Sequence, residues 1–202
     1  MSAYDNVAAN PADTCAVALL LIDVINDFEY PGGDKLFEHA LPAAQRLAAL
    51  KRRAHQRHIP IIYVNDNFGK WRAERSQLVR HCLEDGVRGE PIVRLLEPGE
   101  SDYFVLKPQN SGFYKTPLDL LLAYLKAKTL ILAGFAGDIC VLLTASDAYV
   151  RDFRLFIPSN CSASQEPAEN EYALRYSARV FDADTTPSPD LKLDNLLAHA
   201  AE

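Results

Sequence analysis

The side chains best suited to chemistry are a cysteine, a lysine and two aspartates, and each of them follows or ends a short apolar run. Asp23 ends the run AVALLLID, Asp66 ends IPIIYVND, Lys107 ends YFVLK, and Cys140 follows LILA after a short turn. A carboxylate can accept the proton of a thiol, and an ammonium group can stabilise the negative charge that develops on sulfur or on a substrate. The set therefore predicts nucleophilic catalysis by Cys140. Taken singly, Asp23 also fits a turn cap, and Lys107 also fits a side chain that extends to solvent.

The stretch from Thr129 to Val150 has the pattern of a strand, a turn and a helix that present a nucleophile at the edge of a sheet. It opens as an apolar strand, breaks at Gly134, passes through a turn of small residues and continues as a helix with Cys140 in its first turn. The N-terminus of a helix carries partial positive charge, so we expect this thiol to ionise more easily than a free cysteine. A strand, a tight turn and a nucleophile on the next helix are typical of an α/β sheet. Cysteine is also a common small core residue, and this stretch alone does not decide between the two roles.

Apolar runs alternate with helical patterns along the chain. Runs without polar alternation predict buried strands at 16–24, 59–66, 103–107, 130–133, 153–159 and 180–183. Apolar residues at helical spacing predict helices at 36–58, 72–83, 116–128, 138–150, 167–179 and 190–200. This order predicts an α/β fold in three α-β-α layers, with a parallel sheet and helices on both faces. We expect a flexible lead over residues 1–14 and a single domain over residues 15–202.

The composition excludes several other classes of protein. The chain has 202 residues, a formal net charge of −6 and no run of lysines and arginines, which argues against a nucleic-acid or anionic-membrane partner. It has neither an apolar run of about 20 residues nor a secretory signal pattern. Its four cysteines are widely spaced and form no CxxC pair, so we expect free thiols and a cytoplasmic protein.

Three segments carry a specific resemblance, LLLIDVINDF at 19–28, VLKPQNSGFYKTPLD at 105–119 and LILAGFAGDICV at 130–141. In their order, spacing and flanking residues, the chain from about residue 16 to 183 resembles the isochorismatase-like cysteine hydrolases. The resemblance implies a six-stranded, mostly parallel sheet of Rossmann-like topology and a catalytic triad. In that triad Asp23 would be the base, Lys107 the charged partner and Cys140 the nucleophile.

The resemblance also implies how the site works. A cis peptide between Phe135 and Ala136 would direct the N–H of Ala136, together with that of Cys140, toward a developing oxyanion. The reaction would be hydrolysis of an amide, carbamoyl or ureido C–N bond of a small molecule, through a thioester and without a cofactor, in a homodimer or homotetramer. Members that hydrolyse the vinyl ether of isochorismate generally lack the cysteine, so Cys140 favours the amidohydrolase branch. Gly137 departs from the family, which often carries threonine there, and this puts the substrate contacts of the turn in doubt.

The second strand bears on whether a metal is expected. Nicotinamidases of this family hold a divalent metal with an Asp-x-His arrangement at this place. Asp66 matches the aspartate, but Phe68 occupies the position of the histidine, and His81 is the only histidine in that region. One carboxylate and one imidazole are too few for a zinc site, so we expect no metal. Asp66 and Asn67 are expected either to contact substrate or to cap the next helix.

Aromatic residues near the strand ends are expected to line the substrate pocket. The residues with this expected role are Phe28, Trp71, Phe113 and Phe135. Three other functions stay open at this point. One is a non-catalytic binding or scaffold protein that retains the fold, and another is a metal-assisted amidase of the nicotinamidase type. The third is redox sensing through a disulfide between Cys140 and Cys161.

Overall fold

The sheet at the centre of the computed structural model contains six strands, and every described pairing between them is parallel. The model describes residues 13–67 and 74–199. The strands are β1 (Val17–Ile22), β2 (Ile61–Asp66), β3 (Tyr103–Lys107), β4 (Thr129–Phe135), β5 (Arg154–Phe156) and β6 (Ser162–Ala163). Their order is β3-β2-β1-β4-β5, and β6 pairs with the last two residues of β4. The predicted six-stranded α/β fold is confirmed.

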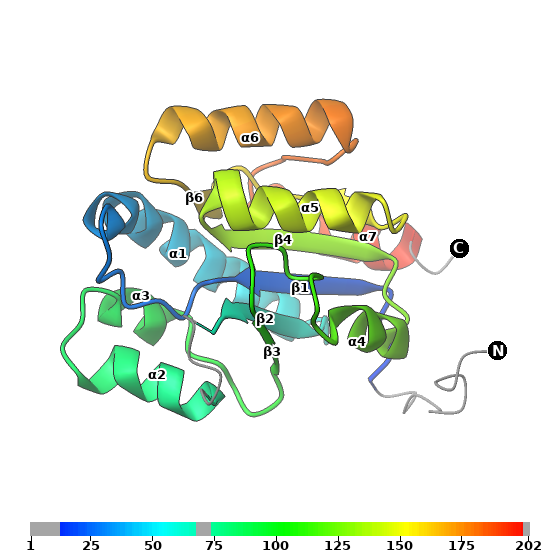
Figure 1. Cartoon of the computed structure of the whole chain (residues 1–202). Coiled ribbons are helices and arrows are strands. Elements are labelled where there is room, and N and C mark those ends of the chain that lie inside the picture. Colours follow the sequence, from blue (N-terminus) through cyan, green and yellow to red (C-terminus); the bar gives the residue numbers. More distant parts are fainter. Residues whose placement is uncertain (1–12, 68–73, 200–202) are drawn as a thin grey trace.

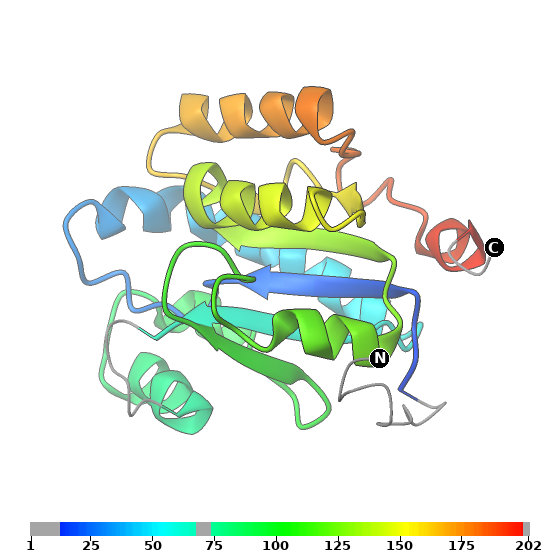
Figure 2. The ribbon, with the colours of Figure 1, turned by 45° about the vertical axis from the view of Figure 1, so that its right-hand side comes forward.

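Helices cover both faces of this sheet (Figures 1 and 2). On one face lie α1 (Gly33–His55), α3 (Glu90–Leu95) and α7 (Leu193–His199), with α2 (Arg75–Glu84) packed beside α3. On the other face lie α4 (Leu118–Leu125) and α5 (Leu142–Tyr149), and α6 (Pro167–Val180) covers α5 and β6. The alternate residues of β1 pack into these two separate apolar clusters, which explains why its sequence shows no polar alternation.

Two predicted elements need correction. The strand expected at 180–183 does not form, because α6 continues to Val180 and the chain then makes an isolated bridge between Phe156 and Asp184. The sixth strand is β6 instead, and a strand of two residues is too short for a periodic pattern to reveal. The polar segment from 67 to 100 also holds α3 in addition to the expected helix.

The parallel arrangement brings the carboxyl ends of β1, β2, β3 and β4 to one edge of the sheet. Within the described ranges, every helix is too short or too polar to span a bilayer. Most of the lead expected at 1–14 lies outside the described residues.

Candidate active site

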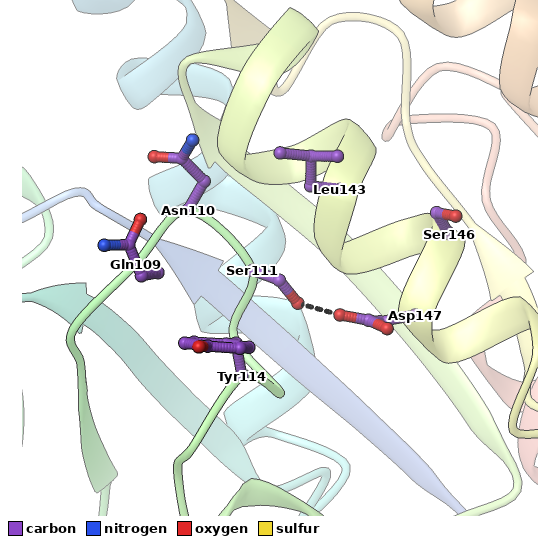
Figure 3. A pocket seen from close by; sticks show the side chains of 7 residues that line it. All are labelled: Gln109, Asn110, Ser111, Tyr114, Leu143, Ser146 and Asp147. Carbon is purple, nitrogen blue, oxygen red and sulfur yellow. Dashed lines mark hydrogen bonds between the residues drawn. The ribbon is translucent and has the colours of Figure 1, made fainter.

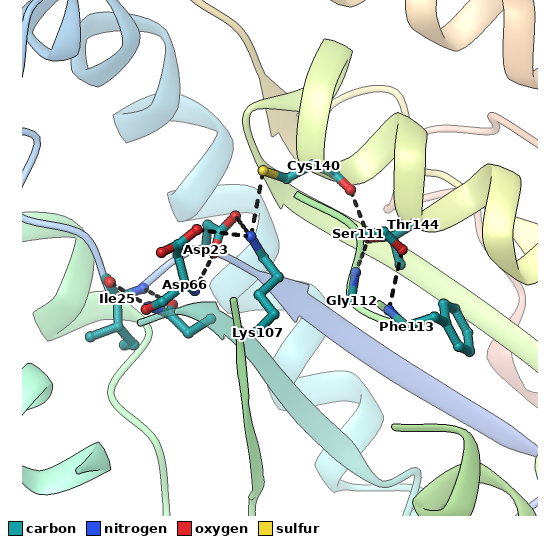
Figure 4. A network of polar contacts seen from close by, with 10 residues as sticks. Asp23, Ile25, Asp66, Lys107, Ser111, Gly112, Phe113, Cys140 and Thr144 are labelled. Atoms are coloured by element: carbon teal, nitrogen blue, oxygen red, sulfur yellow. Dashed lines mark hydrogen bonds and ion pairs between the residues drawn. The ribbon is translucent and has the colours of Figure 1, made fainter. Parts of the chain in front are cut away.

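One lysine connects the three other charged or nucleophilic groups of this edge. Lys107 Nζ lies 2.8 Å from Asp23 Oδ2, 3.6 Å from Asp66 Oδ2 and 3.6 Å from Cys140 Sγ. The side chain of Lys107 is fully buried and that of Asp23 is 7% exposed. Figure 4 shows these side chains converging from β1, β2, β3 and the turn after β4. The four residues singled out by the sequence therefore meet at one place.

The backbone after β1 is shaped to present Asp23. Its φ of 51° lies in the left-handed region, which aspartate tolerates better than most residues. The Asp66 N–H donates a hydrogen bond of 2.6 Å to Asp23 Oδ1, which fixes the carboxylate against the end of β2. The fully buried Asn65 holds the following loop through both sides of its amide: the Ile25 N–H donates to Oδ1 at 3.0 Å, and Nδ2 donates to the Ile25 carbonyl at 2.9 Å.

Cys140 lies in a wider turn than the sequence predicts. The chain after β4 forms a short π-helix, η1 (Gly137–Val141), before α5 begins. The buried Thr144 hydroxyl donates to the Cys140 carbonyl at 2.7 Å and accepts the Gly112 N–H at 3.0 Å. The loop that follows Lys107 is thereby fastened to the helix that follows Cys140 (Figure 4).

The turn between β4 and η1 has the features that the resemblance implies. The peptide between Phe135 and Ala136 is cis. Gly134, with φ 131°, allows β1 to approach closely, because a Cβ there would lie 2.0 Å from the Ile22 carbonyl oxygen. Apart from bonds internal to the helices and strands, no backbone hydrogen bond from the Ala136 or Cys140 N–H occurs in the described part of the chain, so that both can donate to a ligand stays a prediction.

Burial raises the pKa of Asp23, whereas charge raises that of its partner Lys107. Burial raises the pKa of the Asp23 carboxyl, and the charge and hydrogen bond of Lys107 offset only part of this effect. Burial lowers the pKa of Lys107, but the negative charges of Asp23 and Cys140 outweigh it and leave the pKa raised. Lys107 thus stays protonated, and the Asp23 carboxylate is more basic than an ordinary one.

The thiol does not follow the expectation drawn from the helix N-terminus. Burial, followed by the charge of Asp23, raises the pKa of Cys140 to about 12, and the opposing effect of Lys107 is smaller. The predicted easy ionisation is therefore wrong for the resting site. The sulfur keeps its proton at neutral pH, so attack on a substrate requires a neighbouring base.

The predicted pocket residues are dispersed. Phe28 and Phe135 are buried in the apolar cluster on the α1 face, with ring centroids 6.2 Å apart. Phe113 belongs to the apolar cluster of α4 and α5, where it contacts Phe153 at 6.1 Å and does not join the triad. All three aromatics are thus buried in apolar clusters in this structure, and their contact with substrate stays a prediction. Trp71 lies outside the described residues.

The two polar candidates after β2 remain at the edge of the site. Asp66 faces Lys107, and the buried Asn67 donates its N–H to the Lys107 carbonyl at 3.1 Å. Neither caps α2, whose N-cap is Glu74.

Sequence reasoning missed Tyr30. Burial raises the pKa of its phenol, a hydrogen bond with Asn26 lowers it, and the charges of Asp23 and Cys140 also raise it, so the hydroxyl lies within electrostatic reach of the triad. It also missed Asn65. A signal for Asn65 existed in the sequence, since an asparagine inside an apolar strand needs buried hydrogen-bond partners.

The residues around Asp66 do not fit the metal that nicotinamidases of the family hold. Asp66 faces an ammonium group, and His81 directs its two ring nitrogens to other carboxylates, Asp85 at 2.7 Å and Asp27 at 3.3 Å. Within the described residues, no group of three or more His, Cys, Asp or Glu side chains is arranged so that it could hold a metal ion. The donor set therefore gives no support for a catalytic step through a metal.

A hollow of about 380 Å³ lies between the loop after β3 and α5 (Figure 3). Asn110 and Tyr114 line it from the loop, and Leu143 and Asp147 line it from the helix. Ser111 donates a hydrogen bond to Asp147 across its floor. None of the triad residues lines this hollow, so it is distinct from the reactive centre.

Comparison with known proteins identifies the family of this chain. The family model described as Isochorismatase domain matches residues 17–186, and the chain belongs to the isochorismatase family of hydrolases. It is 39% identical over 169 residues to the uncharacterized isochorismatase family protein YaaI of Bacillus subtilis, covering 84% of this chain and 92% of that protein.

Two further relatives have named activities. The chain is 35% identical over 108 residues to the ureidoacrylate amidohydrolase RutB of Methylorubrum extorquens, which covers 53% of this chain and 44% of that protein. The chain thus matches less than half the length of that relative. The solved N-carbamoylsarcosine amidase of Thermoplasma acidophilum is similar with a TM-score of 0.65 and 25% identity, covering 87% of this chain and 98% of that one.

Proposed function

We propose that this protein is a cysteine hydrolase that cleaves the C–N bond of a small amide, carbamoyl or ureido compound. The observation that carries the proposal is the buried Lys107 ammonium, which lies 2.8 Å from the Asp23 carboxylate and 3.6 Å from the Cys140 sulfur. This is a base, a cation and a nucleophile at the edge where α/β enzymes bind substrate. The names of the amidohydrolase and amidase relatives support the same class of reaction.

In the proposed first half-reaction, Asp23 takes the proton of the Cys140 thiol as sulfur attacks the substrate carbonyl carbon. The raised pKa of Cys140 makes this proton transfer necessary, and the raised pKa of Asp23 suits it as the acceptor. The N–H groups of Ala136 and Cys140 would stabilise the oxyanion, and losing one such donor typically costs about 3 kcal/mol of barrier. Asp23 then gives its proton to the departing nitrogen as the C–N bond breaks.

In the second half-reaction, water attacks the thioester. Asp23 takes a proton from that water, and after the C–S bond breaks this proton returns to sulfur. Lys107 remains protonated throughout and limits the charge that builds up among sulfur, Asp23 and substrate. No cofactor enters this cycle.

The proposal includes two features of the protein as a whole. We propose that it works in the cytoplasm, where its thiols stay reduced; the four cysteines are free in the structure. We also propose a homodimer or homotetramer, because closed homo-oligomers are common, and light scattering on the purified protein measures this directly.

The redox alternative loses its basis in the structure. Cys161 is fully buried in the apolar cluster on the α1 face, whereas Cys140 packs against the cluster on the α5 face. The two thiols therefore pack against different apolar clusters.

The decisive test is turnover of a panel of N-carbamoyl amino acids, ureido acids and simple carboxamides, followed by ammonia release. We expect turnover by the wild type, an acyl adduct on the Cys140 peptide in acid-quenched samples, and a loss of at least about 10⁴-fold in Cys140→Ala. Cys15→Ala, which removes another half-buried thiol, is the matched control and should keep full activity. Full turnover by Cys140→Ala would contradict the mechanism. A wild type without turnover or adduct would favour the non-catalytic binding protein.

A further inference from the structure

The turn that carries the two proposed oxyanion amides forms a hydrogen bond at each of its ends to one short segment, Cys161–Ser164. On one side of the turn, the Gly134 N–H donates to the Cys161 carbonyl at 3.1 Å. On the other side, the Asp138 N–H donates to the Ser164 hydroxyl at 3.0 Å. Between these bonds lies the stretch from Phe135 to Gly137, which includes the Ala136 N–H.

Ser164 is itself held in place. It is 1% exposed, and its hydroxyl donates to Asn170 Oδ1 on α6 at 3.4 Å. Asn170 Nδ2 in turn donates to the Ser162 carbonyl at 3.5 Å. Ser164 therefore connects α6 to the turn, because its hydroxyl bonds both Asn170 of α6 and the Asp138 N–H.

The turn has little room to move away from this support. A Cβ on Gly137 would lie 2.0 Å from Asn170 Oδ1, so the asparagine occupies the space that a side chain at position 137 would need. The cavity left between the turn and α6 measures about 10 Å³, roughly the volume needed for one water. Position 137 therefore accommodates only a glycine while Asn170 occupies this space.

We propose that Ser164 is a positioning residue for the oxyanion turn and that Asn170 holds it from α6. This inference rests on the proposed function. Ser164 touches no reacting atom; it fixes the Asp138 amide and thereby the direction of the Ala136 and Cys140 amides, which lie on either side. Stabilisation of an oxyanion depends steeply on the position of its donors, so a small displacement costs rate without removing the nucleophile.

Two reactions of the same thiol separate positioning from packing. In acylation by p-nitrophenyl acetate, sulfur attacks the ester carbonyl and passes through an oxyanion. Asp23 takes the thiol proton, the C–O bond breaks, and p-nitrophenolate departs. The product on the protein is an acetyl thioester of Cys140. In alkylation by iodoacetamide, sulfur displaces iodide at a saturated carbon and no oxyanion forms. A residue that positions the oxyanion amides affects the first reaction and not the second.

The chain offers a matched control for Ser164→Ala. Ser162 is a second buried serine of the same segment, and its Oγ has no hydrogen-bond partner among the described residues. We expect Ser164→Ala to lower the rate of Cys140 acylation at least about 10-fold, with alkylation within twofold of the wild type. Ser162→Ala should leave both rates unchanged. Both rates are read on the Cys140 peptide by mass spectrometry.

A double-mutant cycle tests the support from α6. Gly137→Ala should displace Asn170 and lower acylation, and the same change in an Asn170→Ala background should cost much less, because the space is then open. Additive losses would contradict the match between these two residues.

Four results would overturn the proposal. Acylation of Ser164→Ala at the wild-type rate would show that the hydrogen bond is not needed. Parallel losses of acylation and alkylation, or equal losses in Ser162→Ala, would reduce Ser164 to a packing residue. A wild-type protein whose Cys140 is alkylated but never acylated would overturn the proposed function itself, and the positioning role with it.

Discussion

Two buried lysine–aspartate pairs occur among the described residues, and they lie at opposite ends of β3. At the carboxyl end of the strand, Lys107 pairs with Asp23 at 2.8 Å. At the other end, Asp102 directly precedes the strand and pairs with Lys51 of α1 at 3.0 Å. The residue types and distances are nearly the same, but the pKa of Asp23 is raised and the pKa of Asp102 is lowered.

The cause of this difference is what surrounds each pair. Burial raises the pKa of Asp102, but hydrogen bonds from the Gly99 N–H, His55 and Lys51 outweigh it and leave the pKa lowered. The side chain of His55 is 40% exposed, so water reaches this cluster. Asp23 is paired with a fully buried lysine, and burial prevails there.

The comparison shows which pair is suited to chemistry. Asp102 is an anion satisfied by three donors, and it ties the end of α1 to the segment before β3. Asp23 is a carboxylate of raised basicity whose cation is shared with Asp66 and Cys140. Identity and distance alone do not separate a structural ion pair from a catalytic one; the balance of desolvation against hydrogen bonding does.

The largest expected effect separates the two pairs by turnover. Asp23→Asn should reduce hydrolysis of a good substrate by about 10³-fold or more, because the thiol proton then has no acceptor. Asp102→Asn makes the same chemical change at the other end of β3 and should leave turnover within about twofold. Steady-state rates of the two variants, measured at a temperature where both are folded, test this. Comparable losses in both would remove the distinction.

The sequence was sufficient to predict which side chains meet at most of the candidate site, and the reason is physical. A charged residue that ends an apolar strand of a parallel sheet must lie at the common edge, so Asp23, Asp66 and Lys107 were found from strand ends alone. The cis peptide came from the resemblance to a family. Asp102 carried no comparable signal, since an acid before a strand usually faces solvent.

What the sequence failed to predict depends on three-dimensional surroundings. The helix N-terminus suggested an acidic thiol at Cys140, but burial and the charge of Asp23 reverse the direction. Phe28 and Phe113 follow strand ends as pocket residues do, yet each fills an apolar cluster. The partner of Gly137 on α6 is distant in the chain, so only the fold reveals it.

The second prediction concerns stability. Asp102→Asn should lower the free energy of unfolding by about 3 kcal/mol at pH 7, because it leaves the largely buried Lys51 without its anion. The pKa of Asp102 is lowered in the folded protein, so its contribution is present above the unfolded value of about 3.9 and is lost as pH falls through the folded value. Urea unfolding at pH 7, 5 and 3.5 should show the gap to wild type shrinking at the lowest pH.

The control for this measurement is Asp119→Asn. It removes a pair with Arg151 that is half exposed on the aspartate side, and it should have little effect at any pH. A gap between wild type and Asp102→Asn that stays constant from pH 7 to 3.5 would contradict the assignment of Asp102 as a satisfied anion.

The smallest expected effect is an increase in the reactivity of Cys140 in Asp23→Asn, the same variant that is expected to lose hydrolysis. Asp23 raises the pKa of Cys140 through its charge and its hydrogen bond, whereas Lys107 lowers it. Asp23→Asn therefore lowers the pKa of the thiol, and alkylation by iodoacetamide at pH 8 should become about tenfold faster although hydrolysis is lost; a shift of one pKa unit changes the thiolate fraction tenfold.

Wild-type labelling should keep rising about tenfold per pH unit up to pH 10, since a pKa of about 12 lies above that range. Cys15, labelled in the same digest, is the internal control and should react equally in both proteins. Slower labelling of Cys140 in Asp23→Asn would mean that Asp23 activates the resting thiol, and burial would then not be the cause of the difference between the two lysine–aspartate pairs.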